Sequence, residues 1–330
     1  MAGSSSFKCR LTAQPWGACR KRRAFSFLGG PVTPNKTGGP MTRNRATIIG
    51  ASAILMWSLL AALTIGTAPV PPLLLNALCF CMGGALGLMW TGLGRGFGVL
   101  RGISWKVYAF GTIGLFGYHL LYFTAFRLAP YAQTGLIAYL WPLFIVLLSG
   151  LLPGERLRPL HLIGAALAFG GAAVIVLGGG MGGGPGAAAG LGLAFACALT
   201  WAVYSVLSRW MGDVPTEAVT VFCLATAALS ALTHLGFEQT LWPAGITGWA
   251  SVALLGLGPV GMAFFTWDVG MKRGDIQMLG TLSYAAPLLS TLVLVATGQA
   301  KASPMLAVAA IAITGGAALA ARASRKEPIA

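Results

Sequence analysis

Long apolar runs alternate with short polar or basic segments along most of the chain. A helix needs about 20 apolar residues to cross a bilayer, and this criterion gives ten candidate spans. The first half holds segments 46–66, 71–92, 105–127, 130–152 and 159–178, and the second half holds 187–209, 216–236, 247–271, 275–298 and 303–322. The pattern therefore predicts an all-α polytopic membrane protein with ten transmembrane helices.

The composition supports this class. Hydrophobic residues make up 56% of the chain and charged residues only 9%, whereas a soluble domain has about 25% charged residues. The net charge of +15 does not indicate nucleic-acid binding, because Lys and Arg lie in short segments between apolar runs. The six cysteines form no CxxC pair, so we expect neither a disulfide framework nor a metal site. No Walker A sequence occurs either, and we expect no cofactor.

The distribution of basic residues predicts the orientation. With the N-terminus inside, every Lys and Arg except Arg127 and Lys301 falls on the inner side. Basic residues concentrate in cytoplasmic loops of membrane proteins. We therefore expect a multi-pass protein of the bacterial inner membrane with both termini in the cytoplasm.

Three segments differ from the apolar runs. Residues 1–40 are basic and rich in Ser, Gly and Pro, which predicts a disordered extension, and Met41 is a candidate natural start. The Gly-rich segment 179–186 lacks the spacing of a nucleotide loop and is expected to be a periplasmic linker. Residues 324–330 are expected to form a cytoplasmic tail.

The two halves of the chain resemble each other. A shift of 145 places Tyr139 on Tyr284, Pro142 on Pro287 and Pro159 on Pro304, and a shift of 144 places Trp57 on Trp201. We therefore expect two five-helix repeats, 41–178 and 187–323. Because five is odd, the second copy enters the membrane inverted, an arrangement typical of secondary transporters. A duplicated channel is the alternative, but no ring of charges is present.

Several motifs resemble a known family. Five plus five spans, a Trp in the first span of each half and a Pro in the fourth and ninth resemble the drug/metabolite transporter superfamily. The stretch GERLRPLHLIGAALAFGGAAVIV is similar to its EamA-type exporters, and the stretches GYHLLYFTAFRLAP and AYLWPL resemble the aromatic amino-acid exporter branch. The second half departs from the pattern, because Glu155 falls opposite Ala300.

The third span carries the first candidate site. Tyr118 and Tyr122 lie four residues apart and His119 lies three before Tyr122, so all three lie on neighbouring positions of one helix surface. His119 is about 21 Å along the helix from Trp105 at 1.5 Å per residue. This depth favours the wall of a substrate cavity over an interfacial aromatic belt, although a structural cluster is the alternative.

Five further aromatic residues, Trp57, Tyr139, Trp141, Trp201 and Tyr284, and two prolines complete the candidate set. Trp57 and Trp201 occupy equivalent positions in the repeats and would either bracket a central site or anchor the packing. Tyr139 and Tyr284 each precede a mid-helix proline by three residues. A proline frees a backbone carbonyl and kinks a helix, which predicts either a substrate contact or a hinge. The prolines are Pro142 and Pro287.

Trp141 lies about 200° around an ideal helix from Tyr139, so we expect only one of the two to face the cavity. Asn76 and Gln133 are neutral polar residues within spans, and we expect them to hold helices together. Asp268 lies one turn before Lys272 and is expected to extend toward the cytoplasmic surface instead of forming a proton site.

The predicted membrane interior thus holds no fixed charge, which favours a neutral or zwitterionic substrate with an apolar side chain. Burial favours the uncharged imidazole, so we expect His119 to shape binding without coupling protons. The resemblance implies a monomeric secondary exporter, in contact with membrane lipid, of aromatic and other neutral amino acids. The alternatives are an exporter of another neutral metabolite or drug and, more remotely, an intramembrane enzyme with His119 as base.

Overall fold

The computed structural model describes residues 41–149, 158–178, 186–210, 214–274, 279 and 282–324. These residues form helices joined by short connections, and no strand occurs among them. The all-α prediction is therefore confirmed for the described residues. The predicted extension 1–40, residues 179–185 of the predicted linker and residues 325–330 of the predicted tail lie outside them.

The helices follow the predicted spans closely. In the first half they are α1 (Arg43–Ser58), α2 (Leu60–Gly66), α3 (Pro72–Leu93), the short 3-10 helix η1 (Phe97–Leu100), α4 (Trp105–Leu128), α5 (Tyr131–Ala138), α6 (Trp141–Ser149) and α7 (Pro159–Gly178). In the second half they are α8 (Ala187–Trp210), α9 (Ala218–Phe237), α10 (Gly245–Leu257), the π-helical η2 (Gly258–Met262), α11 (Ala263–Arg273), α13 (Ala286–Ala296) and α14 (Pro304–Ser324).

Length and composition support membrane insertion for several of these elements. Among the described residues, five helical segments are long and apolar enough to cross a membrane, and the bent pair α1–α2 adds a sixth. Three shorter apolar helical stretches, 159–171, 286–296 and 304–319, lie in predicted spans. The fold is that of a polytopic membrane protein.

Two irregularities were not predicted. α1 and α2 meet at a 40° bend, where the Ser58 hydroxyl donates to the carbonyl of Ile54 at 2.8 Å. Such a bond from a serine to the preceding turn often bends a helix. Between α10 and α11 the chain forms the π-helical turn η2, which contains Pro259. Proline lacks the N–H group and clashes with the preceding turn, which explains the local widening.

The repeat is visible in the backbone itself. The helix of the fourth predicted span breaks at 139–140 and that of the ninth at 284–285, directly before Pro142 and Pro287. Their action as hinges stays a prediction. The same backbone hydrogen bonds flank both breaks. In the first copy, Leu140 N–H donates to the carbonyl of Ile137, and Phe144 N–H donates to the carbonyl of Leu140. In the second copy, Ala285 N–H donates to the carbonyl of Leu282, and Leu289 N–H donates to the carbonyl of Ala285.

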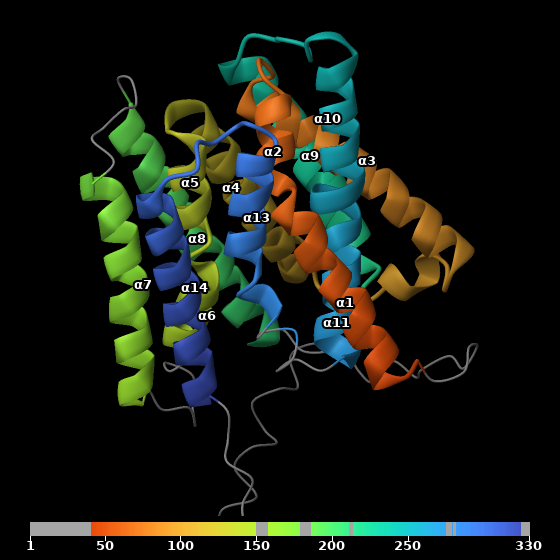
Figure 1. Ribbon diagram of the computed structural model, residues 1–330. Helices are drawn as coiled ribbons and strands as arrows, with labels where there is room; N and C mark the ends of the chain where they lie inside the picture. The colour runs from red at the N-terminus through yellow and green to blue at the C-terminus, as the bar shows by residue number, and fades with distance from the viewer. Residues whose placement is uncertain are drawn as a thin grey trace, which may run out of the picture. The chain divides into compact units, whose positions relative to one another are not determined.

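The closest helix pairs all join the first half to the second. These pairs are α7–α14, α3–α9, α1–α11 and α4–α8, and Figure 1 shows α7 beside α14 and α1 beside α11. The start of α1 and the end of α14 lie at one end of the helix bundle (Figure 1). We call it the α1 end, and we call the opposite end the α2 end.

The α1–α11 and α4–α8 pairs approach closely through small residues, as the α7–α14 pair also does. At the α1 end, an ideal Cβ on Gly50 of α1 would lie 2.8 Å from Cα of Gly270 in α11. At the α2 end, an ideal Cβ on Gly190 of α8 would lie 2.7 Å from Cβ of Ala129, which follows α4. We call these contacts the α1–α11 seam and the α4–α8 seam.

Candidate functional site

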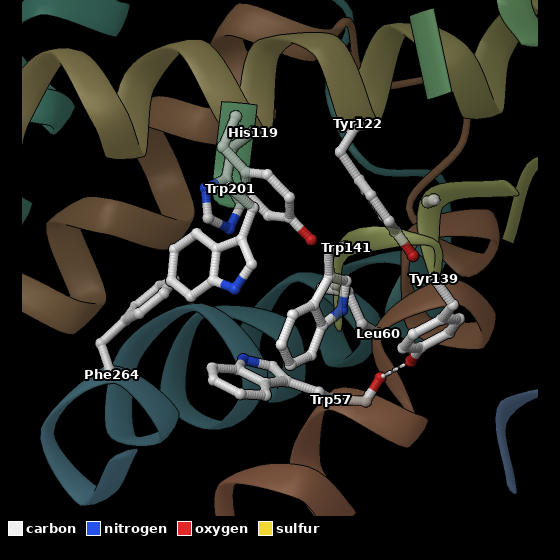
Figure 2. Close-up of a pocket in the computed structure, with 10 residues that line it drawn as sticks. Trp57, Leu60, His119, Tyr122, Tyr139, Trp141, Trp201 and Phe264 are labelled. Carbon is white, nitrogen blue, oxygen red and sulfur yellow. Dashed lines mark hydrogen bonds between the residues drawn. The ribbon is translucent and has the colours of Figure 1, made fainter. Parts of the chain in front are cut away.

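A pocket walled by aromatic side chains lies between the two seams, and Figure 2 shows its lining residues. α1, α2, α4, the α5–α6 break, α8 and α11 all contribute to its wall. The lining residues are Trp57, Leu60, Tyr118, His119, Tyr122, Ala138, Tyr139, Trp141, Trp201 and Phe264.

Most of the predicted site residues meet here although they are far apart in the sequence. Among the predicted substrate-binding residues, Tyr284 does not line the pocket, although it is buried with 6% exposure. The predicted hinge residues Pro142 and Pro287 do not line it either. Phe264 was missed. The internal repeat pointed to Phe264, because a shift of 145 residues places His119 on Phe264 and Tyr122 on Trp267. The imidazole and the Phe264 ring are packed edge to face, with 5.5 Å between their centroids.

Trp57 is the centre of the ring cluster. Its ring contacts Trp141 at 6.3 Å and Trp201 at 6.0 Å between centroids, both nearly perpendicular. It also contacts Trp267 at 5.1 Å. The indole N–H donates to the carbonyl of Pro259 in η2 at 3.1 Å. The π-helical turn therefore supplies the acceptor that fixes this ring.

The α5–α6 break positions the opposite wall. The Tyr139 hydroxyl donates to the backbone carbonyl of Trp57 at 2.7 Å, as the dashed line in Figure 2 shows. Tyr139 and Trp141 both line the pocket. The expectation that only one of them would do so was wrong, because it assumed an unbroken α-helix between them.

His119 is fully enclosed by its neighbours. Its Nδ1 donates to the carbonyl of Leu115 at 2.9 Å, since a carbonyl oxygen only accepts. The imidazole also packs against the rings of Phe80 and Tyr118, each with centroids 4.8 Å away. In the neutral imidazole, Nε2 is then the acceptor atom.

The Tyr122 hydroxyl is the one polar atom of the lining that is buried without a hydrogen-bond partner in the described part of the chain. A buried polar group without a partner costs about 1–3 kcal/mol. The side chain is 2% exposed, and Figure 2 shows its oxygen directed toward the space beside Tyr139. The arrangement suits a ligand that supplies the missing hydrogen bond.

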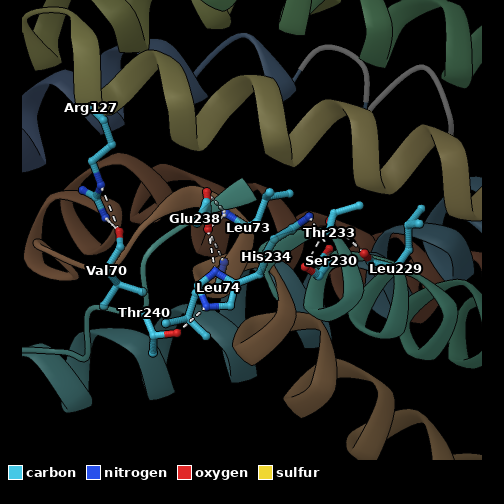
Figure 3. Close-up of polar contacts among 11 residues, drawn as sticks. Val70, Leu73, Leu74, Arg127, Leu229, Ser230, Thr233, His234, Glu238 and Thr240 are labelled. Atoms are coloured by element: carbon cyan, nitrogen blue, oxygen red, sulfur yellow. Dashed lines mark hydrogen bonds and ion pairs between the residues drawn. The ribbon is translucent and has the colours of Figure 1, made fainter. Parts of the chain in front are cut away.

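None of the described Asp, Glu, Lys and Arg residues lines this pocket. Asp268 accepts hydrogen bonds from the Lys272 ammonium at 2.7 Å and from the Thr216 hydroxyl. Glu238 accepts from His234 at 2.8 Å and from the backbone N–H of Leu73 at 2.9 Å (Figure 3).

The Asn76 amide donates to the Ser230 hydroxyl at 3.0 Å and joins α3 to α9, consistent with its expected structural role. The four cysteines described are free, and no cluster of metal-binding side chains occurs among the described residues. The pocket itself encloses only about 20 Å³, room for about one water molecule. An amino acid therefore requires the rings to move apart.

Comparison with known proteins agrees with this architecture. The sequence model of the EamA-like transporter family matches twice, at residues 45–177 and 188–322. The chain is 56% identical over 291 residues to the aromatic amino acid exporter YddG of Ancylobacter novellus, covering 87% of this chain and 100% of that protein. It is 27% identical to the aromatic amino acid exporter YddG of Salmonella typhimurium, covering 76% of this chain and 88% of that protein.

A solved crystal structure 54% identical in sequence superposes with a TM-score of 0.70, covering 86% of this chain and 100% of that one. The family match includes most of both halves, and the apolar helices agree with a multi-pass membrane protein. This chain belongs to the EamA-like transporter family.

Proposed function

We propose that this chain exports aromatic and other large neutral amino acids across the bacterial inner membrane. The observation that carries the proposal is the aromatic pocket between the two halves, whose lining holds no Asp, Glu, Lys or Arg. Aromatic rings favour stacked and edge-to-face contacts with another ring. The exporters named above, whose sequences align with most of this chain, support the same substrate class.

The polar atoms of the pocket suit a zwitterion. The Tyr122 hydroxyl can donate to a carboxylate or accept from an ammonium group, and Nε2 of neutral His119 can accept. No cation of the lining would hold a strongly anionic substrate such as a sugar phosphate. The site therefore fits a neutral molecule with one aromatic or large apolar group.

The helix pairing supports ten spans in two inverted repeats, 41–178 and 187–323, joined by a periplasmic linker. Exchanging the halves maps α7–α14 and α3–α9 onto themselves and maps α1–α11 onto α4–α8. An inverted pair of five-helix units has this property. With the basic residues distributed as they are, the α1 end faces the cytoplasm, and both termini lie there.

The two seams provide the basis for alternating access. In this structure the α1–α11 seam is closed at one end of the pocket and the α4–α8 seam at the other. Opening one seam while the other stays closed would expose the pocket to one side of the membrane at a time. All the parts lie within one chain, so the transporter works as a monomer.

Export of another neutral metabolite or a drug is the alternative, because ring stacking does not require an amino-acid backbone. An intramembrane enzyme is a more remote alternative. His119 has no carboxylate partner among the described residues, so the usual means of activating a histidine base is missing there.

The test is counterflow of labelled phenylalanine into proteoliposomes loaded with unlabelled phenylalanine. We expect the wild-type protein to accumulate label and Trp201→Leu to lose most of this uptake. Trp105→Leu is the matched control, because Trp105 is 72% exposed and lies outside the pocket. Wild-type counterflow of an unrelated neutral drug, with none of phenylalanine, would contradict the proposal.

A further inference from the structure

Two basic side chains at equivalent positions of the repeats make the same backbone contact. Arg127, near the end of α4, donates to the carbonyl of Val70 from Nε at 3.2 Å and from Nη2 at 2.9 Å (Figure 3). Lys272, near the end of α11, donates from Nζ to the carbonyl of Val214. A shift of 145 places Arg127 on Lys272, and a shift of 144 places Val70 on Val214. We call these contacts the Arg127 latch and the Lys272 latch.

The two acceptor valines are exposed to a cation for the same local reason. Each precedes a proline, Pro71 in the first half and Pro215 in the second, and the residue before a proline is disfavoured in the helical conformation. Both valines are non-helical and lie just before the second span of their half, α3 or α9. The third span of each half therefore finds a carbonyl acceptor at the same place.

The Arg127 latch holds the end of the first span. Nη2 also donates to the Thr67 hydroxyl at 2.9 Å, and Nη1 donates to the carbonyl of Thr64 at 3.3 Å. Thr64, Thr67 and Val70 are fully buried, and carbonyls at a helix end carry a partial negative charge that favours a cation. The guanidinium thereby fixes the end of α4 to the end of α2 and to the residues that follow it.

The Lys272 latch includes a carboxylate. Asp268, one turn earlier in α11, accepts from the Lys272 ammonium at 2.7 Å and from the hydroxyl of Thr216. The residue equivalent to Asp268 in the first half is Phe123, so the two latches differ in chemistry although they join equivalent parts. The end of α11 is thereby fixed to the segment that leads into α9.

The latches and the seams hold different sides of the same two helix ends. At the α2 end, the end of α4 contacts α2 through the Arg127 latch, and the residue after α4 contacts α8 at the α4–α8 seam. At the α1 end, the end of α11 contacts the segment before α9 through the Lys272 latch and α1 through the α1–α11 seam. Each latch stays within one half of the chain, whereas each seam joins the two halves.

We propose that Arg127 and Lys272 are positioning residues for alternating access. Each keeps the end of the third span attached to its own half while the neighbouring seam opens, so the pocket opens at the seam alone. Without the latch a second gap forms, between α4 and α2 or between α11 and the segment before α9. The pocket is then reached from that side even while the seam is closed. This inference rests on the proposed function.

The first experiment measures access to the pocket without substrate. Three cysteines are replaced by Ser in the full chain: Cys9, Cys19 and Cys81. Ala138→Cys is then labelled with an impermeant maleimide from one face of the membrane at a time. With the α1 end toward the cytoplasm, we expect Arg127→Gln to speed labelling from the outer face and Lys272→Gln to speed it from the cytoplasmic face. We expect each change to be about tenfold, because hydrogen bonds to charged groups are among the stronger ones. Lys272→Arg should restore the wild-type rate.

The controls separate a latch from a general loss of stability. Arg101→Gln and Lys106→Gln are the matched variants, because they remove the same charges from exposed positions before and within the first turn of α4. General destabilisation speeds labelling from both faces, whereas the loss of one latch acts on one face. Unchanged labelling in Arg127→Gln and Lys272→Gln, equal increases from both faces, or equal effects of the matched variants would overturn the proposal.

Cross-linking distinguishes a contact that stays closed from one that opens during transport. Thr67→Cys with Arg127→Cys replaces the Arg127 latch, and Ala129→Cys with Gly190→Cys spans the α4–α8 seam. A short bifunctional methanethiosulfonate joins either pair, and a reductant releases it. We expect phenylalanine counterflow to recover when the latch pair is joined and to be lost when the seam pair is joined. Loss of counterflow in the joined latch pair, reversed by the reductant, would overturn the proposal.

The two readouts also separate this inference from the proposed function. The labelling needs no substrate, so face-specific increases without wild-type counterflow of phenylalanine would refute the proposed export and keep the latches. Wild-type counterflow, with labelling that neither Arg127→Gln nor Lys272→Gln changes, would refute the latches alone.

Discussion

Adding one methyl group at either seam should shift the transporter toward opposite conformations. In Gly50→Ala, the new Cβ would lie 2.8 Å from Cα of Gly270 and 2.9 Å from Cδ1 of Leu279. Non-bonded carbon atoms prefer about 3.5–4.0 Å, so α1 and α11 must separate by about 1 Å. A backbone atom cannot rotate away, and the closed α1–α11 seam is therefore destabilised.

The size of the effect follows from the packing. Overpacking a close contact costs about 1–3 kcal/mol, which changes an equilibrium about 5- to 150-fold. Gly190→Ala places a methyl group 2.7 Å from Cβ of Ala129 and 3.0 Å from its backbone nitrogen, and it destabilises the α4–α8 seam in the same way. Gly117→Ala is the matched control, because its Cβ would meet nothing within 4 Å.

The assay uses a cysteine at Ala138, which lines the aromatic pocket and is 3% exposed. An impermeant maleimide is applied to either face of the membrane. We expect Gly50→Ala to increase labelling from the cytoplasmic face and Gly190→Ala to increase it from the outer face, with Gly117→Ala unchanged. Equal changes from both faces in both variants, or an effect of Gly117→Ala as large as the others, would refute the two-seam mechanism.

Tyr139→Phe should lower the free energy of unfolding in detergent by about 1 kcal/mol, because it removes a buried hydrogen bond to Trp57. Tyr122→Phe should not lower stability, because it removes a buried hydroxyl that has no partner in the described chain, yet it should weaken phenylalanine counterflow. Equal stability losses in the two variants would contradict this contrast. Glu238→Gln should lower the thermal unfolding temperature more than Glu217→Gln. Glu238 caps α3 and pairs with His234. Glu217 pairs only with the half-exposed Arg95 among the described residues, and exposed ion pairs add little stability. A pH gradient imposed on proteoliposomes with equal phenylalanine on both sides should cause no net accumulation, because the neutral His119 carries no proton across; accumulation abolished by His119→Gln would show proton coupling.

The sequence predicted the helices well because their boundaries depend on strong local signals. Apolar length defines the spans, and Pro142 and Pro287 each remove an N–H group that a continuous helix needs. The breaks directly before both prolines are the result. The bend between α1 and α2 was not predicted. Ser58 donates a hydrogen bond to Ile54 at this bend, but in the sequence Ser58 cannot be distinguished from any other serine within a span.

The site was predicted less completely because its residues meet only through tertiary packing. Phe264 lies in an ordinary apolar run, and only the repeat register connects it with His119. Tyr284 was included by symmetry, but the pocket is lined by the first-half break and not by its second-half copy.

The repeat is thus symmetric in its backbone and asymmetric in its chemistry. The first half has Tyr118, His119 and Tyr122, which all line the pocket. The second half has Ala263, Phe264 and Trp267 at the equivalent positions, and of these Phe264 lines it. One wall of the pocket is therefore hydrogen-bonding and the other is apolar. An amino acid has the same two faces, and it can lay its charged backbone against α4 and its side chain against α11. A symmetric pocket would have to accept the molecule in two opposite orientations, so we infer that the divergence of the two copies is what gives the substrate a single direction in the site.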